Sequence, residues 1–186
     1  MNDHLSGIYV ARTQQGAFAR VSGRGNYQNA APLRQFGQEA IEQGTRAICL
    51  DLGQCQGMDS TFLGVLAGFG LKLLQTGCKD GLHLFNAGDR TLHSCQCLGL
   101  DRLAHLEPGL PDIKDLQPPP EIDFHKLPDT DLTALSKPNA KDETAEIMLE
   151  AHEDLCRCDE KNEVKFKDVK ECLREKLAVQ TEPRLK

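Results

Sequence analysis

Residues 51–66 read DLGQCQGMDSTFLGVL and are the most informative segment of the chain. It continues an apolar run at residues 47–50, which is typical of a strand covered on both faces in a sheet with parallel pairing. The pair Asp59-Ser60 then opens a helical pattern that reaches Gln75 and is closed by Gly77. The stretch therefore predicts a buried strand that leads through a short loop into a helix.

Strands and helices alternate on both sides of this stretch. Upstream, the pattern predicts a hairpin of residues 7–11 and 17–21 and a helix that Asn29 caps and Gly44 ends. Downstream, it predicts a strand at 81–85, a helix that Asp89 caps and an edge strand at 102–106. The order ββαβαβαβ indicates an α/β fold, with a mixed sheet of about five strands covered by helices.

Composition divides the 186 residues after Glu107. The first part holds 9 Lys and Arg against 9 Asp and Glu, and the second holds 13 against 19, so the net charge of −6 lies wholly in the second part. The first part also holds 15 of the 16 glycines, and the second holds 8 of the 9 prolines. We predict a domain at 1–107, a proline-rich linker at 108–138 and an acidic helical extension at 139–186. Three apolar linker residues are candidates for a strap onto the domain: Ile122, Phe124 and Leu127.

The extension is predicted to form one or two amphipathic helices, with Asn162 as a candidate cap for the second. Each helix carries one apolar stripe: Met148, Ala151, His152 and Leu155 in the first, and Phe166, Val169, Leu173 and Leu177 in the second. A narrow apolar stripe on a charged helix must be buried against something. The other helix, the first domain, a partner and a second copy of the chain in a homodimer all remain open.

Several classes of function are excluded by the composition. No run of about 18 apolar residues predicts a membrane span, and no basic segment followed by an apolar one predicts a secretory signal. An acidic chain whose folded part has balanced charge is a poor candidate for binding nucleic acid directly. We expect a cytoplasmic protein whose eight cysteines are thiols.

The sequence indicates neither a metal site nor a catalytic dyad. The pairs Cys95/Cys97 and Cys156/Cys158 are separated by a single residue, a closer spacing than that of structural zinc sites. His152 and the other histidines share no spacing with carboxylates or thiols, and they are interpreted as packing or surface residues. No glycine-rich loop fit to cradle a phosphate is present. We therefore expect a non-enzymatic protein without a cofactor or metal.

Ser60 is the residue that indicates a function. Its hydroxyl stands at a helix N-terminus, among unpaired backbone N–H groups and at the positive end of the helix dipole. One interpretation is plain N-capping, because Asp and Ser are favoured caps. The other is a phosphoacceptor, since a helix N-terminus accommodates an anion and a phosphate adds about −1.5 to −2 charge beside Asp59. The fold would then survive while the surface that a partner meets changes.

Residues 51–66 resemble the signature of STAS domains, which sulphate transporters and anti-sigma factor antagonists share. The matching residues are Asp51-Leu52, Cys55, Met58, Asp59-Ser60 and Leu63-Gly64-Val65-Leu66. The strand at 81–85 and the segment Leu98-Gly99-Leu100 also lie where the family has them, so the resemblance covers about residues 6–107. It implies an α/β, STAS-type mixed sheet covered by helices, followed here by a helical extension.

Within this family the chain looks like an anti-sigma factor antagonist, which implies a partner-switching regulator of transcription. The unphosphorylated antagonist binds an anti-sigma factor that is also a serine kinase. The kinase phosphorylates the antagonist serine, here Ser60, and a serine phosphatase reverses the modification. Thr61 and Phe62 depart from the family pattern, where Ser and Gly are usual, and Thr61 is a second candidate acceptor. The candidate partner contacts are Asp59, Phe62, Leu63, Arg24 and Tyr27.

The helix predicted at 60–75 is apolar nearly all round, more so than a helix on a sheet requires. The apolar surface that does not meet the sheet is either a docking face exposed beside Ser60 or a face that another segment covers. The acidic extension is the candidate cover. Covering by the extension would be autoinhibitory. Gly64 and Gly68 are interpreted as allowing this helix to lie close to the sheet.

Two other functions stay open. The first is a STAS docking subunit of a lipid-transport ATPase complex or a signalling scaffold, in which the serine need not be phosphorylated. The second is a sensor of nucleotides or other small molecules, or a weak hydrolase, and the missing phosphate loop makes this the less favoured of the two.

Overall fold

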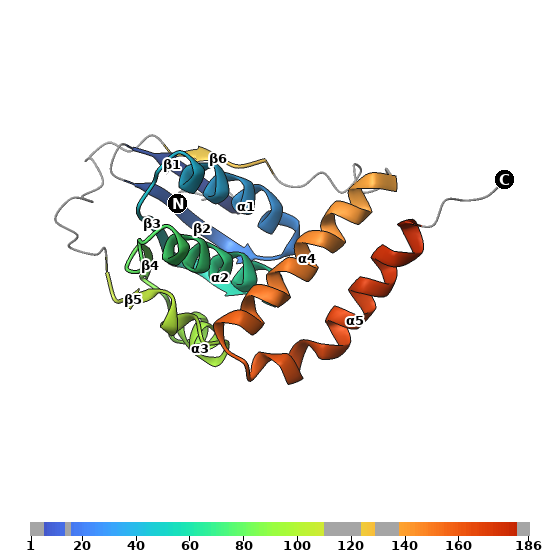
Figure 1. Ribbon diagram of the computed structural model, residues 1–186. Coiled ribbons are helices and arrows are strands. Elements are labelled where there is room, and N and C mark those ends of the chain that lie inside the picture. Colours follow the sequence, from blue (N-terminus) through green and yellow to red (C-terminus); the bar gives the residue numbers. More distant parts are fainter. Residues whose placement is uncertain (1–5, 14–15, 110–123, 129–137, 182–186) are drawn as a thin grey trace.

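The computed structural model describes residues 6–13, 16–109, 124–128 and 138–181, with side chains over 143–178 in the last range. A six-stranded mixed sheet forms its centre (Figure 1). The strands are β1 (Gly7–Arg12), β2 (Ala17–Gly25), β3 (Ile48–Met58), β4 (Leu82–Phe85), β5 (His105–Glu107) and β6 (His125–Lys126). Their order is β5-β4-β3-β2-β1-β6. Strands β2 to β5 pair in parallel, and β1 pairs antiparallel with β2 and β6.

The helices lie in two layers beside the sheet. They are α1 (Tyr27–Glu42), α2 (Ser60–Gln75), α3 (Asp89–Cys97), the 3₁₀ turn η1 (Leu100–Arg102), α4 (Pro138–Cys158) and α5 (Asn162–Thr181). Helices α1 and α2 pack side by side on one face of the sheet (Figure 1). Helix α4 crosses the outer side of α2, and α5 turns back beside α4. The predicted α/β fold and the helical extension are confirmed.

The main core lies between the sheet and the helices α1 and α2. Its largest side chains include Phe62, Phe69 and Leu66, each at most 2% exposed. Two glycines make room for the rings: a Cβ at Gly25 would lie 2.7 Å from Phe62, and one at Gly37 would lie 2.3 Å from Phe69. The bulky Phe62 therefore fits at the start of α2 because β2 has a glycine opposite it.

The linker contributes the sixth strand, one more than the five predicted. Leu127 donates its backbone N–H to Ile8 O at 2.8 Å, next to the pairing of β6 with β1. Phe124 packs on the opposite face of the sheet from the helices, where the Arg20 guanidinium lies 4.7 Å from its ring centroid. The predicted strap is confirmed for Phe124 and Leu127, whereas Ile122 lies outside the described residues.

Several predicted helix caps were wrong in detail. Helix α1 begins three residues earlier than predicted because Asn26 is its cap, and Asn29 instead closes a capping box by accepting from Asn26 N. Helix α3 is preceded by Gly88, and Asp89 is its first residue. Asn162 does begin α5, but its side-chain amide donates to Leu98 O and Leu155 O, at 3.0 and 2.8 Å. This amide ties the α4–α5 turn to the end of α3.

The interpretation of Gly64 and Gly68 was also wrong. Both face α4 and not the sheet: a Cβ at Gly64 would lie 2.3 Å from Ala151 O, and one at Gly68 would lie 2.6 Å from Asp154 Oδ2. A four-residue spacing places two glycines on one side of a helix without indicating what that side meets. Here they open the outer surface of α2 to the backbone of α4.

Candidate functional site

Asp59 organises the carboxyl ends of β2 and β3, where the N-termini of two helices meet. Its Oδ1 accepts from Phe62 N and its Oδ2 accepts from Tyr27 N, both at 2.9 Å, so that one carboxylate caps α2 and also binds the start of α1. Its own backbone N–H donates to Gly25 O at 3.0 Å. A negative charge at two helix N-termini is favourable because each dipole has its positive end there. Asp59 therefore holds the site together.

Ser60 is the first residue of α2, and its side chain is not the cap of that helix. The side chain is half-buried, and its Oγ lies 2.9 Å from His152 Nε2 on α4. The capping interpretation of Ser60 was therefore wrong, because Asp59 fulfils that role. The Ser60 hydroxyl instead connects the domain to the extension across 92 residues of sequence.

His152 is 3% exposed and is held on two sides. Its Nδ1 lies 2.6 Å from Met148 O, and its ring meets the Phe166 ring edge-on, with centroids 4.8 Å apart. A carbonyl oxygen only accepts, so Nδ1 carries the proton and donates it. In the neutral ring Nε2 then offers a lone pair, which accepts the hydroxyl proton of Ser60. The local contacts of α4 and α5 thus orient the acceptor that Ser60 meets.

The predicted site residues divide into two groups. Arg24 and Tyr27 are exposed near the edge where Asp59 and Ser60 lie, and Tyr27 has 39% of its surface accessible. In contrast, the structure buries three of the residues that follow Ser60, with exposures of 2%, 0% and 2%: Thr61, Phe62 and Leu63. In this arrangement Thr61 does not present its hydroxyl to solvent, and Phe62 and Leu63 lie in the core.

Helix α4 covers the outer face of α2 with small and apolar residues and with charged ones. Ala151 lies against Gly64, and Leu155 is fully buried. Asp154, 8% exposed, has its pKa raised to about 6 by burial, although Arg157 pairs with it at 3.0 Å. A cavity of about 110 Å³ lies beside these residues, between α1, α2 and α4. The interface is therefore only partly apolar, and the predicted cover over α2 is the extension.

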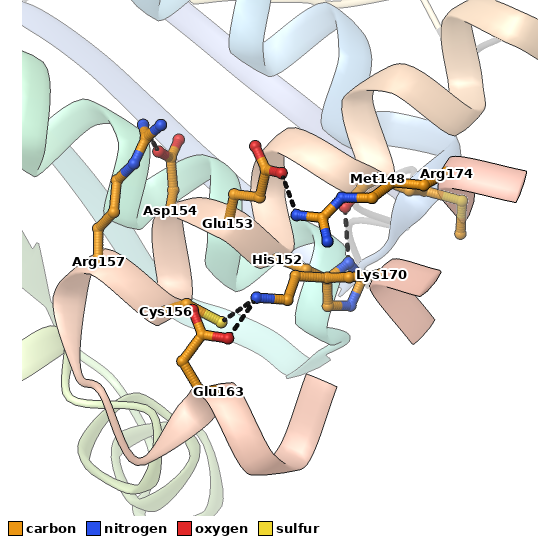
Figure 2. A network of polar contacts seen from close by, with 9 residues as sticks. All are labelled: Met148, His152, Glu153, Asp154, Cys156, Arg157, Glu163, Lys170 and Arg174. Carbon is orange, nitrogen blue, oxygen red and sulfur yellow. Dashed lines mark hydrogen bonds and ion pairs between the residues drawn. The ribbon is translucent and has the colours of Figure 1, made fainter. Parts of the chain in front are cut away.

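A network of polar contacts joins α4 to α5, as Figure 2 shows. Lys170 on α5 is 6% exposed, and its Nζ lies 2.6 Å from Glu163 Oε2 and 3.3 Å from Cys156 Sγ. The hydrogen bond to Glu163 raises the pKa of Lys170, so the side chain stays charged. Arg174 pairs with Glu153 at 2.8 Å. These contacts make the two helices of the extension one unit.

The family model described as "Mlab, STAS domain" matches residues 8–108. The chain belongs to the STAS domain family. The match coincides with the residues over which the sequence resembles this family, and it confirms that resemblance. The STAS domain therefore includes β1 to β5 with α1 to α3, and the extension lies beyond it.

Solved structures similar to this STAS protein include three with related descriptions. An anti-sigma factor antagonist from Mycobacterium paratuberculosis is 26% identical, with a TM-score of 0.49, covering 57% of this chain and 92% of that one. A putative anti-sigma factor antagonist from Thermotoga maritima is 17% identical, with a TM-score of 0.48 and coverages of 54% and 86%. The anti-sigma factor antagonist SpoIIAA in its unphosphorylated form is 19% identical, with a TM-score of 0.45 and coverages of 56% and 88%. No curated protein matches the sequence.

The described residues lack a membrane-spanning helix and a cluster of metal ligands. None of their helices is both long and apolar enough to cross a membrane. Among the same residues, no three His, Cys, Asp or Glu side chains gather as metal ligands. The eight cysteines, all within the described part of the chain, are unpaired thiols.

Sequence reasoning missed His152 as a member of the site. The signal was its position within the apolar stripe of α4, where a polar side chain needs a partner once the stripe is buried. The identity of that partner was not accessible, because Ser60 lies in another element and shares no spacing with it.

Proposed function

We propose that this STAS protein is a partner-switching regulator of the anti-sigma factor antagonist type. It binds an anti-sigma factor that is a serine kinase, and phosphorylation of Ser60 ends that interaction until a serine phosphatase removes the phosphate. The protein acts in the cytoplasm and catalyses no reaction of its own. Arg24 and Tyr27, exposed near Ser60, are the proposed partner contacts.

The observation that carries this proposal is that the Ser60 hydroxyl is not needed to cap its helix. Asp59 accepts from Phe62 N and fulfils that role. A phosphate on Ser60 would therefore leave the capping of α2 intact, and it would stand at the positive end of the helix dipole. It would also add negative charge beside Asp59, on the edge that carries the exposed Arg24. The domain keeps its fold while its surface changes.

Phosphorylation by the kinase tests the proposal directly. The full-length chain is incubated with an anti-sigma serine kinase of the same organism, Mg²⁺ and ATP, and the products are mapped by mass spectrometry. We expect one phosphate on Ser60 and none in Ser60→Ala. The matched control Thr61→Val, which removes a buried hydroxyl, should be phosphorylated like the wild type. Absence of phosphate from Ser60, under conditions that modify a control antagonist, would overturn the proposal.

Binding gives a second measurement. Ser60→Asp should weaken binding of the kinase at least tenfold, with an unchanged unfolding temperature of the domain, whereas Ser60→Ala should retain binding. A large loss of stability in Ser60→Asp would instead mean that Ser60 is a structural residue of the domain.

A docking subunit of a lipid-transport ATPase complex, or a signalling scaffold, is the second candidate. The observation that favours it is the half-buried position of Ser60, whose hydroxyl is already bonded to His152. In that case the chain co-purifies with an ATPase, and Ser60→Ala behaves like the wild type. Dimerisation through the extension is a separate prediction: Val169 on α5 is 42% exposed, and the mass in solution tests it.

A further inference from the structure

The outer face of α2 is shaped to receive a helix backbone. Gly64 and Gly68 lie on this face, and the missing Cβ atoms allow α4 to approach so closely that a Cβ at Gly64 would lie 2.6 Å from Ala151 Cβ. Alanine is a better helix former than glycine, so two glycines within α2 weaken the helix itself. The two glycines instead leave the outer surface of α2 open to the backbone of another helix.

Helix α4, which occupies this face, has features that weaken its interface with the domain. It lays the small Ala151 against Gly64, beside the fully buried Leu155, whereas phenylalanine rings fill the domain core. It also places Asp154 in the interface and pairs Glu150 with Arg34 of α1. Burying a carboxylate costs free energy that apolar contacts must offset, so such an interface is weaker than an apolar one of equal area.

The contact between Ser60 and His152 couples this cover to the serine. The Ser60 hydroxyl lies 2.9 Å from His152 Nε2, and a phosphate ester on Oγ has no proton to donate to that nitrogen. His152 also packs against the Phe166 ring and is 3% exposed, so a phosphate on Oγ would take the place of a close contact between α2 and α4. Helix α4 has six acidic residues against two basic ones, so the incoming negative charge meets a helix of the same sign.

We propose that the face of α2 bearing Gly64 and Gly68 is a helix-docking surface that the chain's own α4 occupies, and that negative charge on Ser60 releases α4 from it. The hydrogen bond between Ser60 and His152 holds α4 in this position, in which α4 is autoinhibitory because it covers Ser60. A kinase must displace α4 to reach Ser60, and the phosphate then keeps α4 from returning. The role of the phosphate rests on the proposed function; the docking of α4 does not.

The native cysteines report on the docked state without any added label. Cys158 is buried at the end of α4, where its Sγ donates to Gly99 O of the domain at 2.9 Å, whereas Cys97 and Cys172 are exposed. Cys49 and Cys95 are both fully buried within the domain. Alkylation rates measured cysteine by cysteine, by mass spectrometry on the full-length chain, therefore separate release of the extension from unfolding of the domain.

Three variants test the proposal. Gly64→Ala places a Cβ against the Ala151 backbone, which cannot swing aside, while it improves the helix propensity of α2. Ser60→Asp introduces the charge. Gly109→Ala is the matched control, because a Cβ there meets nothing within 4 Å.

We expect Cys158 to react at least tenfold faster in Gly64→Ala and Ser60→Asp than in the wild type and Gly109→Ala. Cys156, whose Sγ lies 3.3 Å from Lys170 Nζ of α5, should stay protected within the extension. The rates of Cys49 and Cys95 should not change. Unchanged rates in Gly64→Ala would overturn the docking of α4, and unchanged rates in Ser60→Asp alone would overturn the role of Ser60. If Cys49 and Cys95 accelerate equally, the cover is not separable from the domain and the proposal fails.

The kinase assay distinguishes this proposal from the proposed function. Gly64→Ala should be phosphorylated on Ser60 faster than the wild type, because α4 no longer covers the serine. If no kinase modifies Ser60 in either protein, while Gly64→Ala and Ser60→Asp still expose Cys158, the proposed function fails and the docking surface stands.

Discussion

The STAS domain and the helical extension bury different kinds of side chain. Phe62, Phe69 and Leu66 fill the domain core, whereas the buried residues of the extension include His152 and Lys170, each held by hydrogen bonds. Apolar area stabilises without regard to direction, but polar contacts are satisfied only in one arrangement. The comparison indicates that the domain is held mainly by apolar burial, whereas the position of the extension depends more on specific polar contacts.

The largest effect is expected from Phe62→Ala in the domain. It removes a fully buried ring and should lower the free energy of unfolding by about 3–5 kcal/mol. Phe166→Ala, in the half-buried stripe of α5, is the counterpart and should expose Cys156 with less loss of global stability. Urea unfolding of both variants provides the measurement. Equal losses would show that domain and extension unfold as one unit.

Asp154→Asn should give the next largest effect, which is a change in how stability depends on pH. Burial raises the pKa of Asp154 to about 6 from 3.8, so the folded protein binds this proton more readily than the unfolded chain does. The resulting stabilisation is complete below about pH 4 and is lost as the pH rises through 6, and it amounts to at most about 3 kcal/mol. Arg157, Glu150 and Arg34 are the charged groups that act on this carboxyl.

The difference in thermal unfolding between wild type and Asp154→Asn, measured from pH 4 to 8, isolates this contribution. We expect the unfolding temperature of the wild type to rise relative to that of Asp154→Asn as the pH falls. A difference that does not vary with pH would mean that Asp154 remains charged throughout and that the interface is wetter than the structure shows.

His83 in the domain should respond to pH with the opposite sign and a smaller effect. Burial lowers its pKa below 6.5, so the folded domain favours the neutral ring and loses stability as the pH falls through 6.5 and below. The nearby carboxylate of Glu107, 3.6 Å from Nδ1, partly offsets this. Unfolding of wild type against His83→Gln over pH 5–8 tests it. A wild type that gains stability on acidification relative to the variant would contradict the sign.

The smallest effect is expected for the ion pair between Arg34 and Glu150. Their side chains are 29% and 41% exposed, and pairs of this kind contribute about 0–1 kcal/mol. A double-mutant cycle with Arg34→Gln and Glu150→Gln measures the coupling through urea unfolding. A coupling well above this range would mean that the pair, like the contact between His152 and Ser60, helps to hold α4 on the domain.

The sequence predicted the fold well because local patterns are sufficient for it. The apolar run before Asp51, the helix from Ser60 to Gln75 and the helical extension all follow from periodicity and from turn residues. The contacts of α4 could not be predicted from periodicity, because an apolar stripe can pack on any apolar surface. Gly64 was assigned to the sheet and His152 to no site for the same reason: spacing indicates which residues share a face, not what that face meets.

The short strand β6 has a consequence for how other chains can approach this protein. It pairs with Tyr9 and Val10, so β1 does not end the sheet with a long row of unpaired backbone groups. At the other end of the sheet, β5 is only three residues long. Long open edges invite a strand from another molecule, which leads to aggregation or to recognition by strand addition. In the described part of the chain both edges are short, so they offer little backbone for the addition of such a strand.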